Sequence, residues 1–406
     1  MRDPITVETN ISPRRAVVTA VAALIVVLLL ATLRPSVLGT IVVILAFFVM
    51  IMLHELGHFV MAKRAGMKVT EFFVGFGPRI WSFRRGETEY GLKAFPLGGY
   101  CRIIGMTNLE DIPPEDEPRT YRAKSYPKKF GVAVAGSTVH FIIAIVLMFV
   151  VLAFGDLVKP TTTIGSVMKN EPAAAAGIRP GDRIQSIDAQ TIRSWDDVPK
   201  VISDKGGQTV RFVVERDGLY RSFYVKLATR SDTGERRGFA GIATQTEKES
   251  SSIVDAAIHT PGKVWSVTTE SVGALGKIFS LNGISNYFHT LQGDQNVNPN
   301  DRFISPVGFG RVANQAVNAG WVTVLGLLIA INVFVGLFNL VPLLPFDGGH
   351  IAIATYERIA TAVKGKRVQV DVAKLMPLTV AVIGVLGFIL LSSLFLDISH
   401  PIQNPF

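Results

Sequence analysis

The sequence has little charge and almost no cysteine. Charged residues make up 18% of its 406 residues, against about 25% in soluble domains. Hydrophobic residues make up 49%, and the mean hydropathy is +0.36, so the composition indicates a membrane protein. The single cysteine, Cys101, excludes an internal disulfide and any structural zinc site built on two or more thiolates. A bound metal ion must therefore be held by histidine and carboxylate side chains.

The net charge of +9 raises the question of a nucleic-acid partner. The Lys and Arg residues form no stripe, however, and instead flank the apolar segments, as the positive-inside rule describes. We therefore expect the lipid bilayer, and no nucleic acid, among the partners.

Five apolar segments are long enough to be candidate membrane spans. They are residues 16–33, 37–62, 130–154, 322–344 and 375–396. The first could be a secretory signal or an uncleaved anchor, and the lack of a clear cleavage pattern after it favours the anchor.

Charge predicts the orientation of these spans. Residues 63–129 carry 13 Lys and Arg against 8 Asp and Glu, with bases at both membrane edges, which places this loop in the cytoplasm. Residues 156–320 then lie outside the cytoplasm.

The run His54-Glu55-Leu56-Gly57-His58 lies inside the second apolar segment. On a helix, histidines four residues apart share one face and can bind one zinc ion. Glu55 between them can act as a general base toward water. Such a motif can arise by chance, but two His and a Glu are costly in lipid, so its membrane setting favours a functional site.

A catalytic zinc usually has three protein ligands and one open position. The third-ligand candidate is Asp347, within the sequence NLVPLLPFDGGH that begins at Asn339. Pro342 and Pro345 should end the helix, and the following glycines permit irregular backbone. Such irregular backbone at membrane depth must be buried in protein or line a cavity. An ionisable residue in that position, such as Asp347, predicts a functional site. His350 fits a neighbour of the site better than a fourth ligand.

Together these motifs resemble those of the site-2 protease family of intramembrane zinc proteases. HExxH in one transmembrane helix is paired with N-x2-P-x4-D-G in a later one. The resemblance implies that Zn2+ is bound by His54, His58 and Asp347. It also implies that Glu55 is the catalytic base and that Asn339 helps to hold or polarise the substrate. The arrangement is similar to the bacterial branch that carries extracytoplasmic PDZ domains and cleaves membrane-bound anti-sigma factors.

Residues 88–104 combine β-formers with Pro96 and the pair Gly98-Gly99. The pattern alone predicts a cytoplasmic hairpin. The family resemblance instead implies a re-entrant β-hairpin whose edge strand binds the substrate, with Gly98 and Gly99 among its substrate-binding residues. Strand addition would supply an unwound substrate with hydrogen-bond partners that lipid cannot provide.

Residues 164–227 have the spacing of one PDZ domain, with a short helix, a glycine turn and alternating strands. Such a domain could bind a peptide or protein by β-augmentation, or act as a size filter without a ligand.

The predicted organisation is an N-terminal anchor helix (1–36), a membrane core with the HExxH helix and hairpin (37–154), the PDZ domain (160–229), an extracytoplasmic linker and helical region (230–320), and a membrane core with the Asp347 motif and a C-terminal helix (321–406).

One segment departs from the family pattern. Where the family often has Gly-Pro-x-x-Asn, this chain has Gly136-Ser-Thr-Val-His140. A neutral histidine can donate and accept hydrogen bonds, so His140 could pack between helices or line the cavity. We disfavour a metal-ligand role, because a fourth protein ligand would close the water position.

The predicted fold is a polytopic α-helical membrane protein with four or five transmembrane helices, a membrane-associated β-hairpin and one extracytoplasmic PDZ domain. The predicted function is a zinc-dependent intramembrane endopeptidase of the bacterial cell membrane, with its active site toward the cytoplasmic side. Its substrates would be single-pass proteins already trimmed outside the membrane, such as anti-sigma factors. The alternatives are a zinc transporter, although no internal repeat is visible, and an inert PDZ scaffold.

Overall fold

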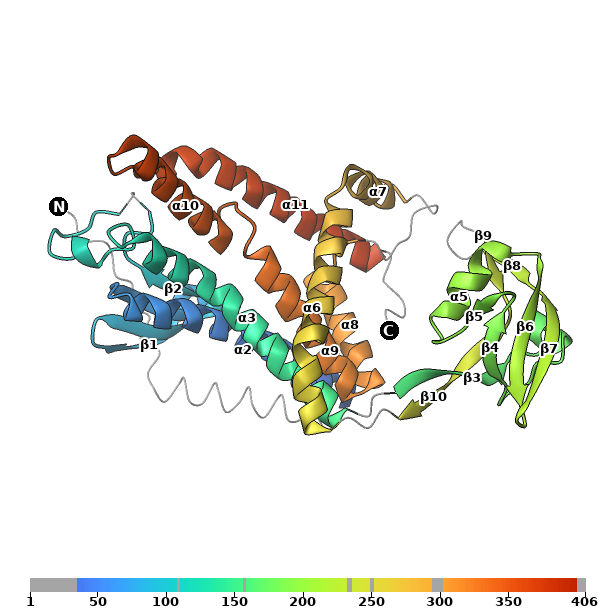
Figure 1. Ribbon diagram of the computed structural model, residues 1–406. Helices are drawn as coiled ribbons and strands as arrows, with labels where there is room; N and C mark the ends of the chain where they lie inside the picture. The colour runs from blue at the N-terminus through green and yellow to red at the C-terminus, as the bar shows by residue number, and fades with distance from the viewer. Residues whose placement is uncertain are drawn as a thin grey trace. The chain divides into compact units, whose positions relative to one another are not determined.

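The computed structural model describes residues 35–107, 110–155, 158–231, 236–248, 252–293 and 302–399 (Figure 1). The predicted span at residues 16–33 lies outside this part of the chain. Two compact units make up the fold. We call them the helical unit, which contains residues up to 151, 257–291 and 299 onward, and the sheet unit, which contains residues 152–256 and 292–298.

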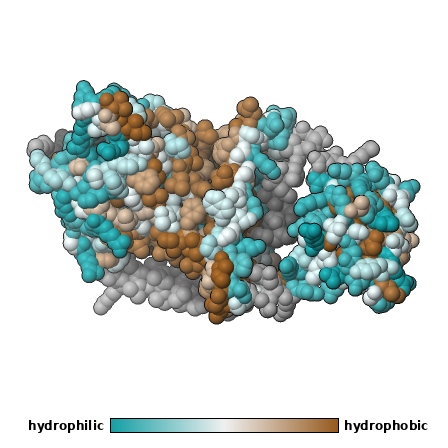
Figure 2. Space-filling view, in the orientation of Figure 1, coloured by the Kyte–Doolittle hydropathy of each residue, from teal (hydrophilic) through white to brown (hydrophobic). Residues whose placement is uncertain are grey.

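Four helices among the described residues are long and apolar enough to cross a membrane, and all belong to the helical unit. They lie in α2 (Pro35–Arg64), α3 (Tyr126–Phe154), α9 (Trp321–Phe338) and α11 (Met376–Ser399). Figure 2 shows apolar side chains gathered over the middle of this unit, as expected where lipid replaces water. The prediction of a polytopic helical membrane protein is confirmed.

Helix α9 ends six residues before the predicted span does. Asn339 caps it, and the chain then turns until α10 (Asp347–Lys364) begins. The amide of Gly348 donates to the carbonyl of Asn339 at 2.7 Å, which closes the irregular loop between the two helices. A Cβ at Gly348 would lie 2.3 Å from the carbonyl oxygen of Leu340, so only glycine fits there.

Strands β1 (Val69–Arg85) and β2 (Thr88–Ile103) form a two-stranded sheet in the helical unit. The hairpin prediction for residues 88–104 therefore covered only its second strand, and β1 was missed. The register of the pairing shifts along the two strands. As a result, residues 72–76 of β1 pair with residues 90–95 of β2 and also with residues 99–101 of β2. No further strand among the described residues pairs with residues 99–101, which leaves them at the margin of the sheet.

The rest of the helical unit consists of further helical elements. They are η1 (Glu117–Arg119), α6 (Ile253–Ile278), α7 (Leu281–Leu291), α8 (Pro306–Ala319) and η3 (Val372–Leu375). Helix α8 packs against α2, α9 and α11, so it ties the HExxH helix to the later spans.

The sheet unit contains a six-stranded sheet in the order β10–β3–β4–β6–β7, with β5 paired to β4. The strands are β3 (Val158–Val167), β4 (Arg183–Ile187), β5 (Gln190–Thr191), β6 (Thr209–Arg216), β7 (Leu219–Lys226) and β10 (Ile242–Lys248). Helices α4 (Pro172–Ala175), α5 (Asp197–Ile202) and η2 (Ser203–Lys205) and the hairpin β8 (Ala228–Ser231) with β9 (Arg236–Phe239) complete it. Its core is aliphatic around Phe212, which is fully buried.

Candidate metal centre

The two histidines of the HExxH motif lie on one face of α2, inside one of the candidate spans. Both are buried, and the Nε2 atoms of His54 and His58 are 3.2 Å apart. Their spacing of four residues produces this arrangement, because residues i and i+4 of a helix lie one above the other. The motif therefore presents two nitrogen ligands to one point.

Helix α3 forms the wall behind these histidines. A Cβ at Gly136 would lie 2.3 Å from Cε1 of His54 and 2.5 Å from Nε2 of His58, so the absence of a side chain there makes room for both rings. Nδ1 of His58 lies 2.8 Å from the carbonyl oxygen of Val132 and donates to it. The proton on Nδ1 leaves a lone pair on Nε2, which is the tautomer that a metal ion needs.

Asp347 completes the group as the first residue of α10. Its Oδ2 lies 3.1 Å from Nε2 of His58 and 3.4 Å from Nε2 of His54. A tetrahedral zinc ion with bonds of about 2.0–2.2 Å places neighbouring ligand atoms about 3.3 Å apart. Three electron-pair donors turned toward one point repel one another unless a cation lies among them. The residues present thus fit a zinc ion.

Glu55 lies beside the three ligand candidates and against the margin of the β1–β2 sheet. The backbone amide of Cys101 lies close to the Glu55 carboxylate, and both residues line one cavity. A Cβ at Gly99 would lie 3.4 Å from Cγ of Glu55, so this strand passes close to the side chain. Gly98, one residue earlier, is left-handed (φ 141°) and lies against the ring of Phe76 instead.

Two cavities border the three ligand candidates. The larger, of about 260 Å³, is lined by His54, Glu55, Asp347, Asn339 and His140 together with apolar neighbours. The smaller, of about 120 Å³, is lined by Glu55, His58, Asp347, Cys101 and His350 among others. A liquid water molecule takes about 30 Å³, so both cavities have room for water. Glu55 and Asp347 belong to both, and Asn339 only to the larger.

His140 has a partner that the sequence analysis did not identify. Nδ1 of His140 lies 3.0 Å from Oδ1 of Asn332 on α9, and both residues are buried. Nδ2 of Asn332 donates to the carbonyl of Leu328, so its oxygen faces the histidine. The ring centres of His140 and His54 are 4.9 Å apart. A polar Asn inside an apolar span was the only signal for this residue.

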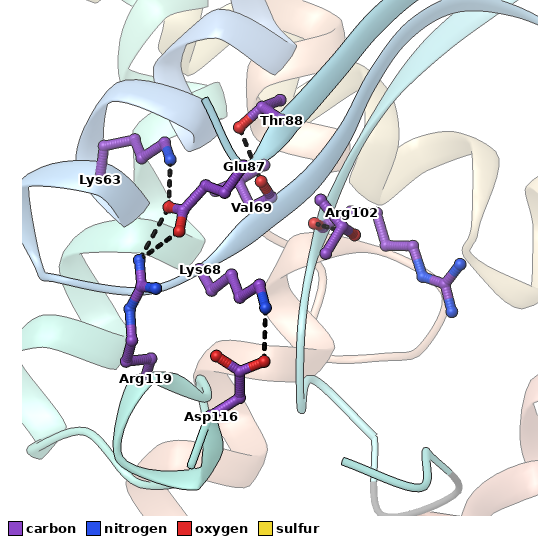
Figure 3. A network of polar contacts seen from close by, with 9 residues as sticks. Lys63, Lys68, Val69, Glu87, Thr88, Arg102, Asp116 and Arg119 are labelled. Atoms are coloured by element: carbon purple, nitrogen blue, oxygen red, sulfur yellow. Dashed lines mark hydrogen bonds and ion pairs between the residues drawn. The ribbon is translucent and has the colours of Figure 1, made fainter. Parts of the chain in front are cut away.

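An ion-pair network joins the turn of the sheet to the end of α2 (Figure 3). Glu87 accepts from Lys63 at 2.5 Å and from Nη2 of Arg119 at 2.6 and 2.8 Å. Burial alone would raise the pKa of Glu87, but the two cations outweigh it and lower that pKa. Beside it, Lys68 pairs with Asp116. The network holds the sheet in place relative to the helix that carries the HExxH motif.

A zinc-type donor set with an adjacent carboxylate, inside a group of candidate membrane spans, is typical of a membrane metallohydrolase. The model for peptidase family M50 matches residues 42–383. Zinc metalloprotease Rip1 of Mycolicibacterium smegmatis is 33% identical over 90% of this chain and 98% of its own length. Rip1 of Mycobacterium tuberculosis is 34% identical with the same coverage. Metalloprotease MmpA of Caulobacter vibrioides is 28% identical over 77% of this chain and 84% of its own.

The chain belongs to peptidase family M50, the site-2 protease family, and is a membrane-embedded zinc metalloprotease. The predictions of the family, of the enzyme class and of Zn2+ as cofactor are confirmed.

Proposed function

We propose that this metalloprotease cleaves peptide bonds inside the membrane, within single-pass proteins that another protease has already shortened outside it. Anti-sigma factors and similar regulators are the expected substrates. The observation that carries the proposal is the place of His54, His58 and Asp347. They converge between α2 and the start of α10, among helices whose composition is apolar enough to cross a membrane. This position supports a substrate peptide bond that comes from within the bilayer.

In this proposal, His54, His58 and Asp347 would hold the zinc ion, which would supply a Lewis acid for activating water and polarising a carbonyl group. Glu55 accepts a proton from the attacking water and returns it to the leaving amine. Asn339, in the larger cavity, donates a hydrogen bond to the substrate carbonyl. The amide of Cys101, which lies close to the Glu55 carboxylate, would hold it in position for both proton transfers.

We further propose that the substrate joins the sheet margin at residues 98–103. A helical peptide bond is shielded by its own hydrogen bonds, so the substrate must unwind before cleavage. An exposed strand edge offers backbone partners that lipid lacks. Gly98 and Gly99 have no side chains, and Gly99 lies against Glu55, so an added strand would place a peptide bond near the base.

The sheet unit is proposed to be a PDZ domain, assigned to residues 160–229 with β8 to β10 completing it. Strand β10 lies at one end of the sheet order. A cavity of about 320 Å³ lies between residues of the α5 region, such as Trp195 and Ile202, and residues 238–242. A strand at the sheet margin beside a helix is the arrangement that binds peptides by β-augmentation, and it favours a peptide or protein ligand over a spacer.

We propose that the protein spans the bacterial cell membrane several times, with an anchor helix at residues 1–36 and membrane cores at 37–154 and 321–406. The basic residues at the end of α2 and the start of α3 support a cytoplasmic position for that end of the spans, and so for the metal site. The sheet unit and the region 230–320 would lie outside the cytoplasm.

Mapping the cleavage site tests the substrate class. A model single-pass substrate with a short outer segment is incubated with the full chain in proteoliposomes, and its fragments are sized by mass spectrometry. We expect one cut within the apolar segment and a much slower cut in a version with a folded outer domain. Cleavage only in the soluble flanks would contradict the proposal. Zinc flux without any cleavage would indicate a transporter. A protein that binds zinc but shows neither cleavage nor zinc flux would indicate a scaffold.

A further inference from the structure

A further polar cavity, which none of the ligand candidates lines, lies at the end of the helical unit where α3 begins. Its volume is about 140 Å³. Four cationic side chains and one carboxylate line it, which gives a net charge of +3. They are Lys124 and Lys129 near the start of α3, Glu357 and Arg358 on α10, and Arg367 in the loop that follows α10.

The single carboxylate of this cavity already has its partners. Oε2 of Glu357 accepts from Nζ of Lys129 at 2.7 Å, and both side chains are largely buried. Oε1 of Glu357 accepts from the backbone amide of Val370 at 3.0 Å. Glu357 therefore balances Lys129, and the charges of Lys124, Arg358 and Arg367 remain.

Two of these cations are held in place by uncharged groups. Nζ of Lys124 donates to the carbonyl of Pro118 at 2.9 Å, and Nη2 of Arg367 donates to the carbonyl of Arg122 at 2.9 Å. Glu117, an acid outside the lining, is paired with Arg122 and also interacts electrostatically with Arg367.

The pKa of Lys124 is lowered by its surroundings, which include two cations outside the cavity lining. Burial lowers it first, and repulsion from Lys128 and Arg119 lowers it further. Holding more cations than anions together is unfavourable, and a bound anion would offset the excess positive charge.

The place of the cavity indicates which anion. The apolar span of α3 starts at Tyr126, which also lines the cavity, so the cavity lies at a membrane edge. In Figure 2 this end of the helical unit is mostly hydrophilic and borders the apolar middle. Basic pockets between helices at membrane edges suit phosphate head groups, and 140 Å³ is several times the ~30 Å³ of one water molecule.

We infer that this cavity is a binding site for the phosphate group of an anionic membrane lipid. Lys124, Arg358 and Arg367 would contact the phosphate oxygens, with Arg donating in a fork that suits them. The buried pair Lys129–Glu357 would keep α3 and α10 at the spacing that the site needs. The inference does not depend on the identity of the protease substrate.

The test is a lipid titration of the full-length protein in detergent micelles, read by native mass spectrometry with phosphatidylglycerol or phosphatidylcholine as the probe. The variant is Arg358→Gln/Arg367→Gln. The matched control is Lys364→Gln/Lys366→Gln, which removes the same charge from exposed residues of the same region that do not line the cavity. Arg358→Gln alone is included because Arg358 is exposed and its loss should not disturb folding.

We expect the wild type to prefer phosphatidylglycerol and the double variant to bind it on the order of tenfold more weakly, since charged hydrogen bonds are lost. The single variant should lie between them, and the control should match the wild type. An equal loss of phosphatidylglycerol affinity in the double variant and in the control would indicate a diffuse basic surface and overturn the inference. Binding of inorganic phosphate with no preference between the two lipids would overturn the lipid assignment.

Discussion

The backbone amide of Cys101 lies close to the carboxylate of Glu55, and both residues line the smaller cavity beside the metal centre. This contact joins the margin of the β1–β2 sheet to the HExxH helix. It means that the strand proposed to receive the substrate also orients the proposed general base. A change in the strand at this position should therefore affect the chemistry without touching any metal ligand.

Cys101→Pro removes this amide donor, whereas Cys101→Ala keeps it. We expect the proline variant to cleave a model substrate at least tenfold more slowly, with zinc still bound, and the alanine variant to stay near wild type. Cleavage rate and zinc content of the purified proteins are the measurements. Equal rates in the two variants would show that the contact has no role in catalysis.

Gly136→Ala should disrupt the metal centre. The added Cβ would lie within 2.5 Å of atoms in both histidine rings, so the rings must move apart. We expect zinc content to fall well below one ion per chain, with activity falling in parallel. Gly131→Ala on the same helix is the control, because its Cβ would meet only the flexible end of Met61 at 3.4 Å. Full zinc occupancy in Gly136→Ala would contradict the geometry described for the centre.

His140→Asn tests the pair that His140 forms with Asn332. If His140 packs the helices and is not a ligand, zinc content should be unchanged. The loss of one buried hydrogen bond should lower the free energy of unfolding by about 1 kcal/mol. Metal analysis and thermal unfolding in detergent are the measurements. Loss of zinc in this variant would instead identify His140 as part of the metal site.

The sheet unit should lose stability in acid through Asp182. Burial acts to raise the pKa of Asp182, but its bonds to Arg216 and to the amide of Arg179 outweigh burial and lower that pKa. Because the folded pKa lies below the unfolded value of about 3.9, the stabilisation is fully present above that pH. It is lost as the pH falls through the lower folded pKa.

Asp182→Asn should remove both the stabilisation and its acid dependence. We expect a loss of about 3 kcal/mol at neutral pH, because Arg216 would be left without its buried partner. Hydrogen exchange of the β4 and β6 amides in the full-length protein, compared between pH 7 and pH 3, is the measurement. If the hydrogen exchange of the wild type changed with pH in the same way as that of the variant, Asp182 would not be the source of the acid sensitivity.

Apolar periodicity and length were enough to predict α2, α3 and α11, because long uncharged runs fit few structures other than membrane helices. The grouping of His54, His58 and Asp347 was also predictable. Two of the residues share a helix face, and the third follows a proline-rich break at membrane depth. The roles of the site residues remain predictions.

Strand β1 could not be predicted in the same way. Gly75, Gly77 and Pro78 interrupt its alternation, and the strand exists because it pairs with β2 through a bulged register. The pair His140 and Asn332 was equally inaccessible, because the two residues are 192 positions apart and meet only where α3 packs near α9. The end of α9 at Phe338 agrees with the predicted effect of Pro342, which has no N–H to donate to the carbonyl four residues earlier.

The most direct test of the central claim compares wild type with Glu55→Gln, with cleavage of a trimmed single-pass substrate and zinc content measured on the same purified samples. The account predicts about one zinc ion per chain in both proteins and cleavage only by the wild type, since the variant keeps all three ligands and lacks the base. Cleavage by Glu55→Gln at a rate near that of the wild type, with equal zinc, would contradict it.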